Sequence, residues 1–344
     1  MSRPGWIRWI CLAALFILLS GCSLFRGDEQ ASVQQIDPPP ADTENLDPVS
    51  QSAEGVEEEP ETAKVALYFK DPDGYVVPLS MEVPNVPWIA KQSLEYMKAD
   101  GPVQDQLPQG FQPLLPAGTE VKGINILEKE KLAIVDFSTE FARYRAEDER
   151  KLLEAVTWTL TQFPAIEQVQ FWIEGELLKE MPVDGTPLTE PLSRSIGINI
   201  ERKEGVYFSQ ASPVTLYFQK QAKDMTYYVP VTRFIERTNN IAMASLEQLI
   251  SGPLTQTGLA SVISPETVLP TVSQKEDMIT VNFDESILDA NNQIPEETYY
   301  SIVLSLVETT GADKVQILVN GKPQGIGGQG TPVSRPNHLN PVGM

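Results

Sequence analysis

The chain has 344 residues and a formal net charge of −21, from 47 acidic and 26 basic residues. This length suggests roughly two domains of about 150 residues each, and the acidity argues against binding to nucleic acid or to anionic lipid head groups. The two cysteines, Cys11 and Cys22, both lie near the N-terminus, so the rest of the chain contains neither a disulfide nor a thiol.

A basic segment with Arg3 and Arg8 precedes an apolar run at residues 10–19, which has signal-peptide length and is too short to cross a bilayer comfortably. The run ends in Leu19-Ser20-Gly21-Cys22, which resembles a bacterial lipobox. That resemblance implies a signal peptide at 1–21, cleavage before Cys22 and acylation of its sulfur; firm anchorage then takes two or three acyl chains. The alternative is an uncleaved N-terminal anchor with an incidental cysteine.

Residues 22–63 are predicted to form a disordered, acidic, proline-rich tether. The 36 residues from 28 to 63 contain no aromatic residue, lysine or arginine, but they contain Asp37-Pro-Pro-Pro40 and three consecutive glutamates at 57–59. Such a composition cannot bury enough apolar surface to fold, and as a flexible coil it spans roughly 30–36 Å. A cation site in the acidic run is the less favoured alternative.

Beyond the tether the sequence repeats itself, so we predict two domains, at 64–205 and 206–344. Phe137 and Phe283 are 146 positions apart, and so are Gly175 and Gly321. Self-similarity at a fixed spacing indicates tandem copies of one module. Each copy reads strand, strand, helix, strand, strand, helix, strand, which predicts an α+β fold of two tandem two-layer sandwich domains. The join at 201–212 is short, so we expect the copies to pack together.

In the first copy the predicted strands are 65–69, 75–81, 121–127, 132–137 and 169–174, and the predicted helices are 88–98 and 147–163. Ala90, Leu94 and Met97 should share one buried helix face, and Leu153, Val156, Leu160 and Phe163 another. The second copy restates these elements at 214–218, 225–230, 279–283, 296–307 and 315–319. There Tyr299, Ile302 and Leu306 take the positions of Leu153, Val156 and Leu160.

One turn has the spacing of a calcium loop, because Asp71, Asp73 and Glu82 fall at its positions 1, 3 and 12. Position 6 of such a loop requires glycine for a sharp bend and is Val76 here. We therefore predict an ordinary turn and no metal site.

Candidate catalytic groups are few. The one histidine, His338, lies near the C-terminus in a segment rich in proline and asparagine, and no histidine–cysteine cluster exists for zinc. Gly325-Ile-Gly327-Gly328 is better explained as a flexible connection than as a phosphate loop. Asp136 and Glu140 could form a carboxylate pair for glycan cleavage. Against this, Asn282 replaces Asp136 in the second copy, and an aspartate at a strand end is most often a turn or capping group. Trp88, Trp158 and Trp172 are expected in the core or at an interface. We predict no enzyme activity, cofactor or metal.

Four stretches of the first copy resemble the core motif of the GerMN domain family: residues 131–138, Glu149, Thr159-Leu-Thr-Gln-Phe-Pro164, and 169–175. The second copy departs from it at Asn282 and at Ser305-Leu-Val-Glu-Thr-Thr310. The resemblance implies a fold similar to the ring-building motif of secretion-system proteins. It also implies a role in the complex that spans the space between mother-cell and forespore membranes, in sporulation and spore germination.

Two classes of function remain. The first is a non-enzymatic scaffold, lipid-anchored through Cys22 on the extracytoplasmic face of the mother-cell membrane and bound to envelope proteins of the sporulation channel complex. The second is an enzyme acting on cortex peptidoglycan, or a muropeptide-binding lipoprotein, which would use Asp136 with Glu140. A solute-binding lipoprotein ranks third, since it would need two larger domains around a cleft.

Overall fold

The computed structural model describes residues 61–202, 205–207, 210–223, 225–254, 258–326, 330–336 and 339–342, all within one compact unit. Cys22, the predicted signal peptide, most of the predicted tether and His338 lie outside the described residues. Within the described ranges, no helix combines the length and the apolar character needed to span a membrane.

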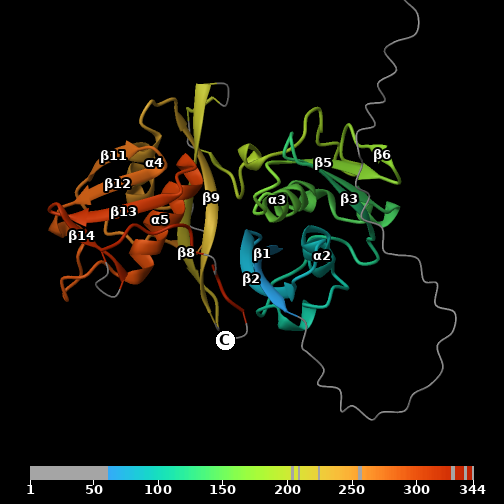
Figure 1. Cartoon of the computed structure of the whole chain (residues 1–344), viewed down its shortest axis with the longest axis horizontal. Coiled ribbons are helices and arrows are strands. Elements are labelled where there is room, and N and C mark those ends of the chain that lie inside the picture. The colour runs from blue at the N-terminus through green and yellow to red at the C-terminus, as the bar shows by residue number, and fades with distance from the viewer. Residues whose placement is uncertain are drawn as a thin grey trace, which may run out of the picture. The chain divides into compact units, whose positions relative to one another are not determined.

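The first repeat begins with an antiparallel hairpin of β1 (Thr62–Lys70) and β2 (Val76–Pro84), followed by helix α2 (Ile89–Tyr96) (Figure 1). A four-stranded sheet in the order β3-β4-β5-β6 completes it. Its strands are β3 (Val121–Leu127), β4 (Leu132–Phe137), β5 (Gln168–Ile173) and β6 (Glu176–Leu177). Helix α3 (Glu149–Leu160) connects β4 to β5, which run parallel.

The second repeat has the same plan. Its hairpin is β8 (Ala211–Gln221) with β9 (Thr226–Glu236), extended by the short strands β7 (Glu201–Arg202) and β10 (Leu259–Ala260). After helix α4 (Ile241–Ser251) comes the sheet β11-β12-β13-β14, with α5 (Glu296–Thr310) joining the parallel pair β12 and β13. The sheet strands are Thr271–Lys275, Met278–Phe283, Lys314–Val319 and Lys322–Gln324. Short 3₁₀ turns lie at Gln104–Gln106, Thr139–Ala142, Ala146–Asp148, Arg194–Ile196 and Glu285–Ile287.

The predicted order of elements and the α+β class are confirmed, and the hairpin adds a layer that the sequence did not predict. Each hairpin forms its own sheet, and the helices lie between it and the four-stranded sheet. Figure 1 shows α3 between β1 and β5. Helix α3 is accordingly buried from Leu152 to Leu160 without interruption, beyond the single stripe that we expected. Phe163, expected on that stripe, lies past the end of α3 and is only partly buried.

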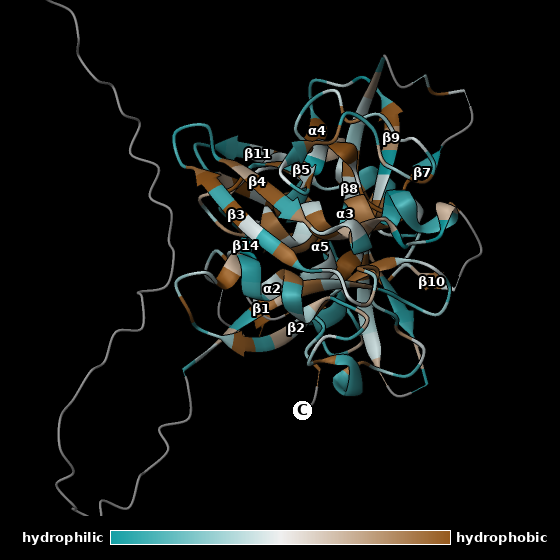
Figure 2. Ribbon diagram, turned by 90° about the vertical axis from the view of Figure 1, so that its right-hand side faces the viewer, coloured by the Kyte–Doolittle hydropathy of each residue, from teal (hydrophilic) through white to brown (hydrophobic). Residues whose placement is uncertain are grey.

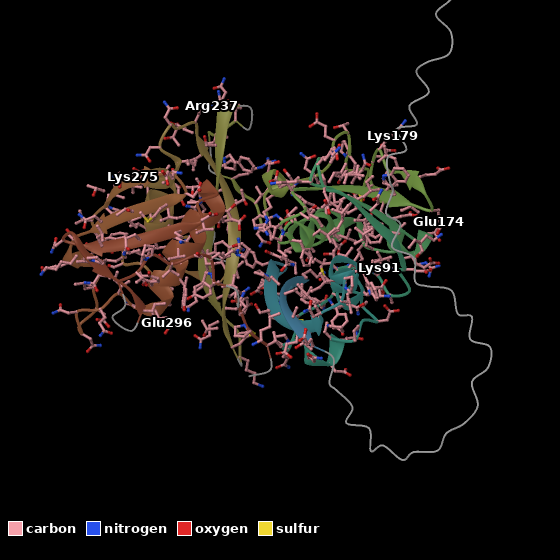
Figure 3. The ribbon with its side chains drawn as sticks, viewed as in Figure 1. Lys91, Glu174, Lys179, Arg237, Lys275 and Glu296 are labelled. Carbon is pink, nitrogen blue, oxygen red and sulfur yellow. The ribbon has the colours of Figure 1, made fainter. Side chains whose placement is uncertain are left out.

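Alternating side chains of the central strands form the core of each repeat. In β4, Ala133, Val135 and Phe137 are buried while the residues between them are partly exposed, and β12 repeats the pattern. Figure 2 shows hydrophobic and hydrophilic segments following one another along the strands and helices. The rings of Phe137 and Phe141 stack with centroids 4.2 Å apart. Charged side chains such as Lys91, Lys179 and Arg237 lie at the outside (Figure 3).

A side chain from the last turn of the long helix, or from just beyond its end, satisfies one strand edge of each hairpin. In the first repeat the amide of Gln162 accepts a hydrogen bond from Ala66 N and donates one to Ala66 O, both at 2.8 Å. The amide thus replaces a neighbouring strand. In the second repeat the hydroxyl of Thr309 bonds Thr215 N and O at 3.0 and 3.1 Å. The departure of the second copy from the motif is therefore compensated one position along the helix.

The turns after β5 and β13 have left-handed backbone at both central residues. Glu174 and Gly175 have φ of 53° and 79°, and Asn320 and Gly321 have φ of 49° and 75°. These are values of a two-residue type I′ hairpin, in which glycine adopts positive φ without steric cost. Glycine is therefore favoured at both predicted turn positions, because its backbone adopts the left-handed conformation that the turn requires.

We expect Gly175→Ala to lower the free energy of unfolding by about 1–2 kcal/mol, because a Cβ disfavours the left-handed conformation. Gly123→Ala is the matched control: a Cβ at either position meets no atom within 4 Å, and only Gly175 has positive φ. Urea unfolding of the two variants measures the difference. Equal effects at both positions would refute the backbone explanation.

Candidate functional site at the contact between the repeats

The carboxylate considered for glycan cleavage has a structural role. Asp136 accepts a hydrogen bond from Gly175 N at 3.0 Å, and Asn282 accepts the equivalent bond from Gly321 N at 2.8 Å. Since an amide serves as well as an acid, the position needs no ionisable group. Hydrogen bonds from Ser138 hold the pKa of Glu140 below its ordinary value, whereas a general acid needs a raised pKa. The capping role suggested by sequence fits both copies.

The turn with calcium-like spacing is held by a lysine of the second repeat. Asp71 accepts hydrogen bonds from the backbone of Asp73 and Tyr75 at 2.9 and 2.8 Å through one oxygen. Its other oxygen accepts from Lys220 Nζ at 2.8 Å and from the Tyr227 hydroxyl at 2.9 Å. Glu82 points away as an exposed residue of β2. Among the described residues no group of three or more acidic, histidine or cysteine side chains could hold a metal ion.

This ion pair joins equivalent positions of the two copies. Asp71 follows Tyr68-Phe69-Lys70, and Lys220 follows Tyr217-Phe218-Gln219. The aspartate is fully buried and the lysine nearly so. Contact between equivalent positions is the mark of an approximately twofold interface. The repeats therefore pack together, as the short join predicted.

Two asparagines hold strands β2 and β9 together with the same symmetry. Asn199 bonds the backbone N and O of Val76 in β2 at 2.7 and 2.8 Å, and it donates to Pro230 O in β9 at 2.7 Å. Asn340 bonds N and O of Tyr228 in β9 at 2.7 and 2.8 Å, and it donates to Pro78 O in β2 at 2.8 Å.

Their backbone explains the residue type at both positions. The φ of Asn199 is 47° and that of Asn340 is 53°, in the left-handed region that asparagine tolerates better than most residues. Each side-chain amide has one acceptor oxygen and two donor hydrogens. The oxygen and one hydrogen bind the backbone N–H and C=O of one residue in one hairpin, and the second hydrogen binds a carbonyl oxygen of the other hairpin.

A buried charge cluster completes the contact. Arg194, from the end of the first repeat, donates to both carboxylate oxygens of Glu308 on α5 at 2.8 and 2.7 Å, and its guanidinium lies 4.6 Å from the Trp158 ring centre. Arg335 also binds Glu308 and donates to the Tyr217 hydroxyl at 2.9 Å. Burial by itself would raise the pKa of Glu308, but the two arginines lower it to about 2.

Most of these contact residues were not predicted from the sequence, although repeat signals for them exist. Arg194 and Asn199 stand five positions apart, and so do Arg335 and Asn340. Tyr75-Val-Val-Pro78 and Tyr227-Tyr-Val-Pro230 mark the two strands that meet. No periodicity within a helix or strand connects these four segments, so only their recurrence in both copies could have singled them out.

The tryptophans divide between core and surface: Trp158 is fully buried, Trp172 is partly buried, and Trp88 is half exposed before α2. Of the glycine-containing segment 325–328, only residues 325 and 326 are described.

The chain is similar to known proteins over both repeats. The Germane family, described as "Sporulation and spore germination", matches residues 66–179 and 215–325. The spore germination protein GerM of Bacillus subtilis (strain 168) is 38% identical over 363 aligned positions, covering 98% of each chain. The solved tandem GerMN domains of the sporulation protein GerM from Bacillus subtilis superpose with a TM-score of 0.76 at 39% identity, covering 82% of this chain and 100% of that one.

The capping role of Asp136 can be tested with a substitution already present in the second repeat. Asp136→Asn should change the free energy of unfolding by less than about 0.5 kcal/mol, while Asp136→Ala should lower it by about 1 kcal/mol through the lost hydrogen bond to Gly175 N. Denaturant titration distinguishes them, and an equal loss in both variants would show that the charge matters.

We expect Glu308→Gln to lower the free energy of unfolding by about 3 kcal/mol, because two partly buried guanidinium groups lose their counter-charge. The folded pKa of Glu308, about 2, lies below the unfolded value of about 4.3. Its contribution is therefore fully present above pH ~4.5 and is lost as the pH falls towards 2.

The measurement for Glu308 is the unfolding free energy between pH 7 and pH 2. The wild-type chain should lose stability more steeply below pH ~4.5 than the Glu308→Gln variant does. Glu247→Gln, at an exposed position of α4, is the charge-matched control and should follow the wild type. Parallel curves for wild type and Glu308→Gln would contradict the buried cluster.

Proposed function

The chain belongs to the Germane family of sporulation and spore germination proteins, and from this premise we propose that it is a non-enzymatic scaffold of the sporulation envelope complex. Its role lies in sporulation and germination. The observation that best supports a scaffold is the contact between the repeats, where buried ion pairs and two asparagines join both hairpins. Such a contact makes a two-repeat platform with fixed relative orientation.

The proposal includes a lipid anchor on Cys22 at the extracytoplasmic face of the mother-cell membrane, with envelope proteins between mother cell and forespore as partners. Residues 1–21 would be removed, 22–63 would act as the tether, and the repeats at 64–205 and 206–344 would reach the partners. The support is the lipobox-like Leu19-Ser20-Gly21-Cys22. Strand β1 begins at Thr62, close to the proposed start of the first repeat.

The absence of enzyme activity is part of the proposal. It is supported by the engagement of Asp136 in a turn and by the lowered pKa of Glu140. The peptidoglycan alternative would need one of these groups as a general acid, and no contact of either residue favours it.

The test is affinity purification of the tagged chain from membranes of sporulating cells. We expect envelope proteins of the sporulation complex to co-purify with the wild-type chain and to be lost with Cys22→Ala, which should leave the membrane fraction or stay unprocessed. Cys11→Ala is the matched control, because it removes a thiol from the apolar run and leaves the lipobox-like motif intact. Retention of lipidated mobility by Cys22→Ala would reject the anchor.

A second experiment in sporulating cells tests for enzyme activity. The double variant Asp136→Asn with Glu140→Gln keeps the hydrogen-bonding shape of both side chains, so spore yield and cortex composition should match the wild type. A defect in cortex composition in cells with normal levels of this variant would overturn the scaffold proposal.

A further inference from the structure

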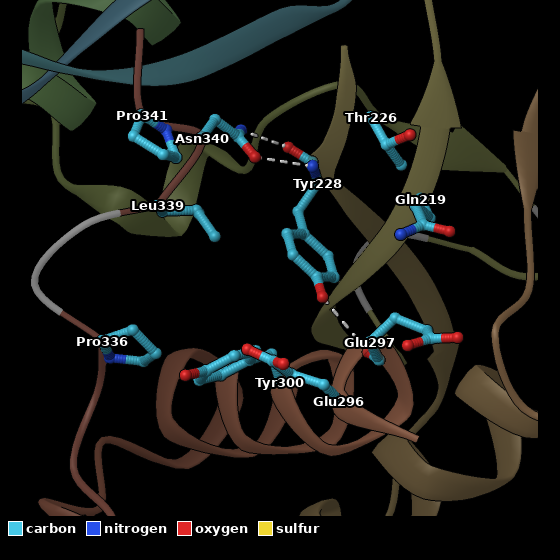
Figure 4. A pocket seen from close by; sticks show the side chains of 10 residues that line it. All are labelled: Gln219, Thr226, Tyr228, Glu296, Glu297, Tyr300, Pro336, Leu339, Asn340 and Pro341. Carbon is cyan, nitrogen blue, oxygen red and sulfur yellow. Dashed lines mark hydrogen bonds between the residues drawn. The ribbon is translucent and has the colours of Figure 1, made fainter. Parts of the chain in front are cut away.

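The second repeat contains a cavity of about 530 Å³ between the start of α5, the hairpin β8–β9 and the C-terminal segment (Figure 4). The side chains of Tyr228 and Tyr300 face it from the hairpin and from α5. Glu296 and Glu297 are exposed in the first turn of α5, at its rim. Among the described residues neither carboxylate forms an ion pair.

At the equivalent place in the first repeat, an arginine of the chain itself is bound. Arg150 forms an ion pair with Glu154 at 3.0 Å and donates to Ile196 O at 2.5 Å. Glu154 is buried and accepts from Asn199 N at 3.1 Å. A guanidinium thus lies between α3 and the segment that ends in the bridging asparagine.

The second copy has acids where the first has two bases, and a tyrosine where the first has an acid. With the 146-residue offset of the long helices, Arg150 corresponds to Glu296, Lys151 to Glu297 and Glu154 to Tyr300. In the hairpin, Tyr228 stands where the first repeat has Val76. The second copy thus has no guanidinium at the position of Arg150, and it has two tyrosines and two glutamates around the corresponding place.

These groups select a cation. Tyrosine faces attract guanidinium or ammonium groups, and the two exposed carboxylates at the rim add a modest Coulomb attraction. The N-terminus of α5 by itself would favour an anion, but Glu296 and Glu297 already occupy that first turn. An arginine suits the site better than a lysine, since its planar group stacks on rings and pairs with carboxylates in two directions.

We infer that this cavity binds an arginine side chain presented by a partner protein, in the place that Arg150 fills within the first repeat. The inference rests on the proposed scaffold function and names the chemistry of one partner contact. The second repeat then recognises the partner, while the first repeat closes its equivalent site internally.

The experiment uses the full chain in detergent micelles and saturation-transfer NMR, which detects weak ligands. The probe is the peptide acetyl-Gly-Arg-Gly-amide, with a dissociation constant expected at about 1 mM for a single side-chain contact. The citrulline peptide has the same shape without charge and should bind at least about fivefold more weakly. Inorganic phosphate should not compete.

Two variants test the residues. Glu296→Gln with Glu297→Gln should weaken binding of the arginine peptide by about fivefold to tenfold, and so should Tyr300→Leu. The charge-matched control is Glu266→Gln with Glu276→Gln, at exposed turns of the same repeat, and it should bind as the wild type does. Circular dichroism of each variant shows that the fold is kept.

A third variant restores the first-repeat pattern. Glu296→Arg with Tyr300→Glu should fill the cavity from within and abolish binding. Equal affinity for the arginine and citrulline peptides, competition by phosphate, or wild-type affinity in the glutamine variant would each overturn the inference. A peptide that binds while no envelope protein co-purifies would reject the scaffold function alone, and the converse result would reject this inference alone.

Discussion

The packing of the two repeats depends on the contact between two strands that each contain a proline. Strands β2 and β9 lie adjacent, yet they belong to separate sheets. Pro78 and Pro230 have no amide hydrogen, so a continuous ladder cannot form at the middle of the contact. Asn199 and Asn340 supply the missing donors and acceptors from the side. Because each asparagine contacts both hairpins, loss of either would leave buried backbone groups without partners, which is costly.

The charges at this contact make the two copies complementary and prevent either from replacing the other. Asp71 and Lys220 hold equivalent positions and pair across the contact. Two first repeats meeting in the same way would place aspartate against aspartate, and two second repeats would place lysine against lysine, so like charges would repel at short range. This repulsion favours pairing within one chain over exchange between chains.

The two repeats differ at one position near the end of the long helix, and the difference affects both the hairpin edge and the charge cluster. Gln162 satisfies β1 in the first repeat, and its counterpart Glu308 binds two arginines instead. This change was possible because Thr309 took over the hydrogen bonds to β8. At the start of α5 the second repeat has a cavity, where the first repeat has the ion pair of Arg150 with Glu154. In the second repeat Glu308 thus binds arginines of the chain itself, whereas Glu296 and Tyr300 line the cavity.

The sequence by itself determined the duplication, the order of elements and the buried faces, because spacing of 146 residues and the periods of helix and strand are local properties of the chain. It also indicated that Asp136 caps a turn, since Asn282 replaces it. It did not determine that the hairpins form separate sheets, nor that Lys220 occupies the calcium-like turn. Those features depend on contacts between residues more than a hundred positions apart, such as Asn199 with Val76 and Asn340 with Pro78. Only the tertiary structure brings such residues together, because hydrogen bonding across an interface leaves no periodic signal in either segment.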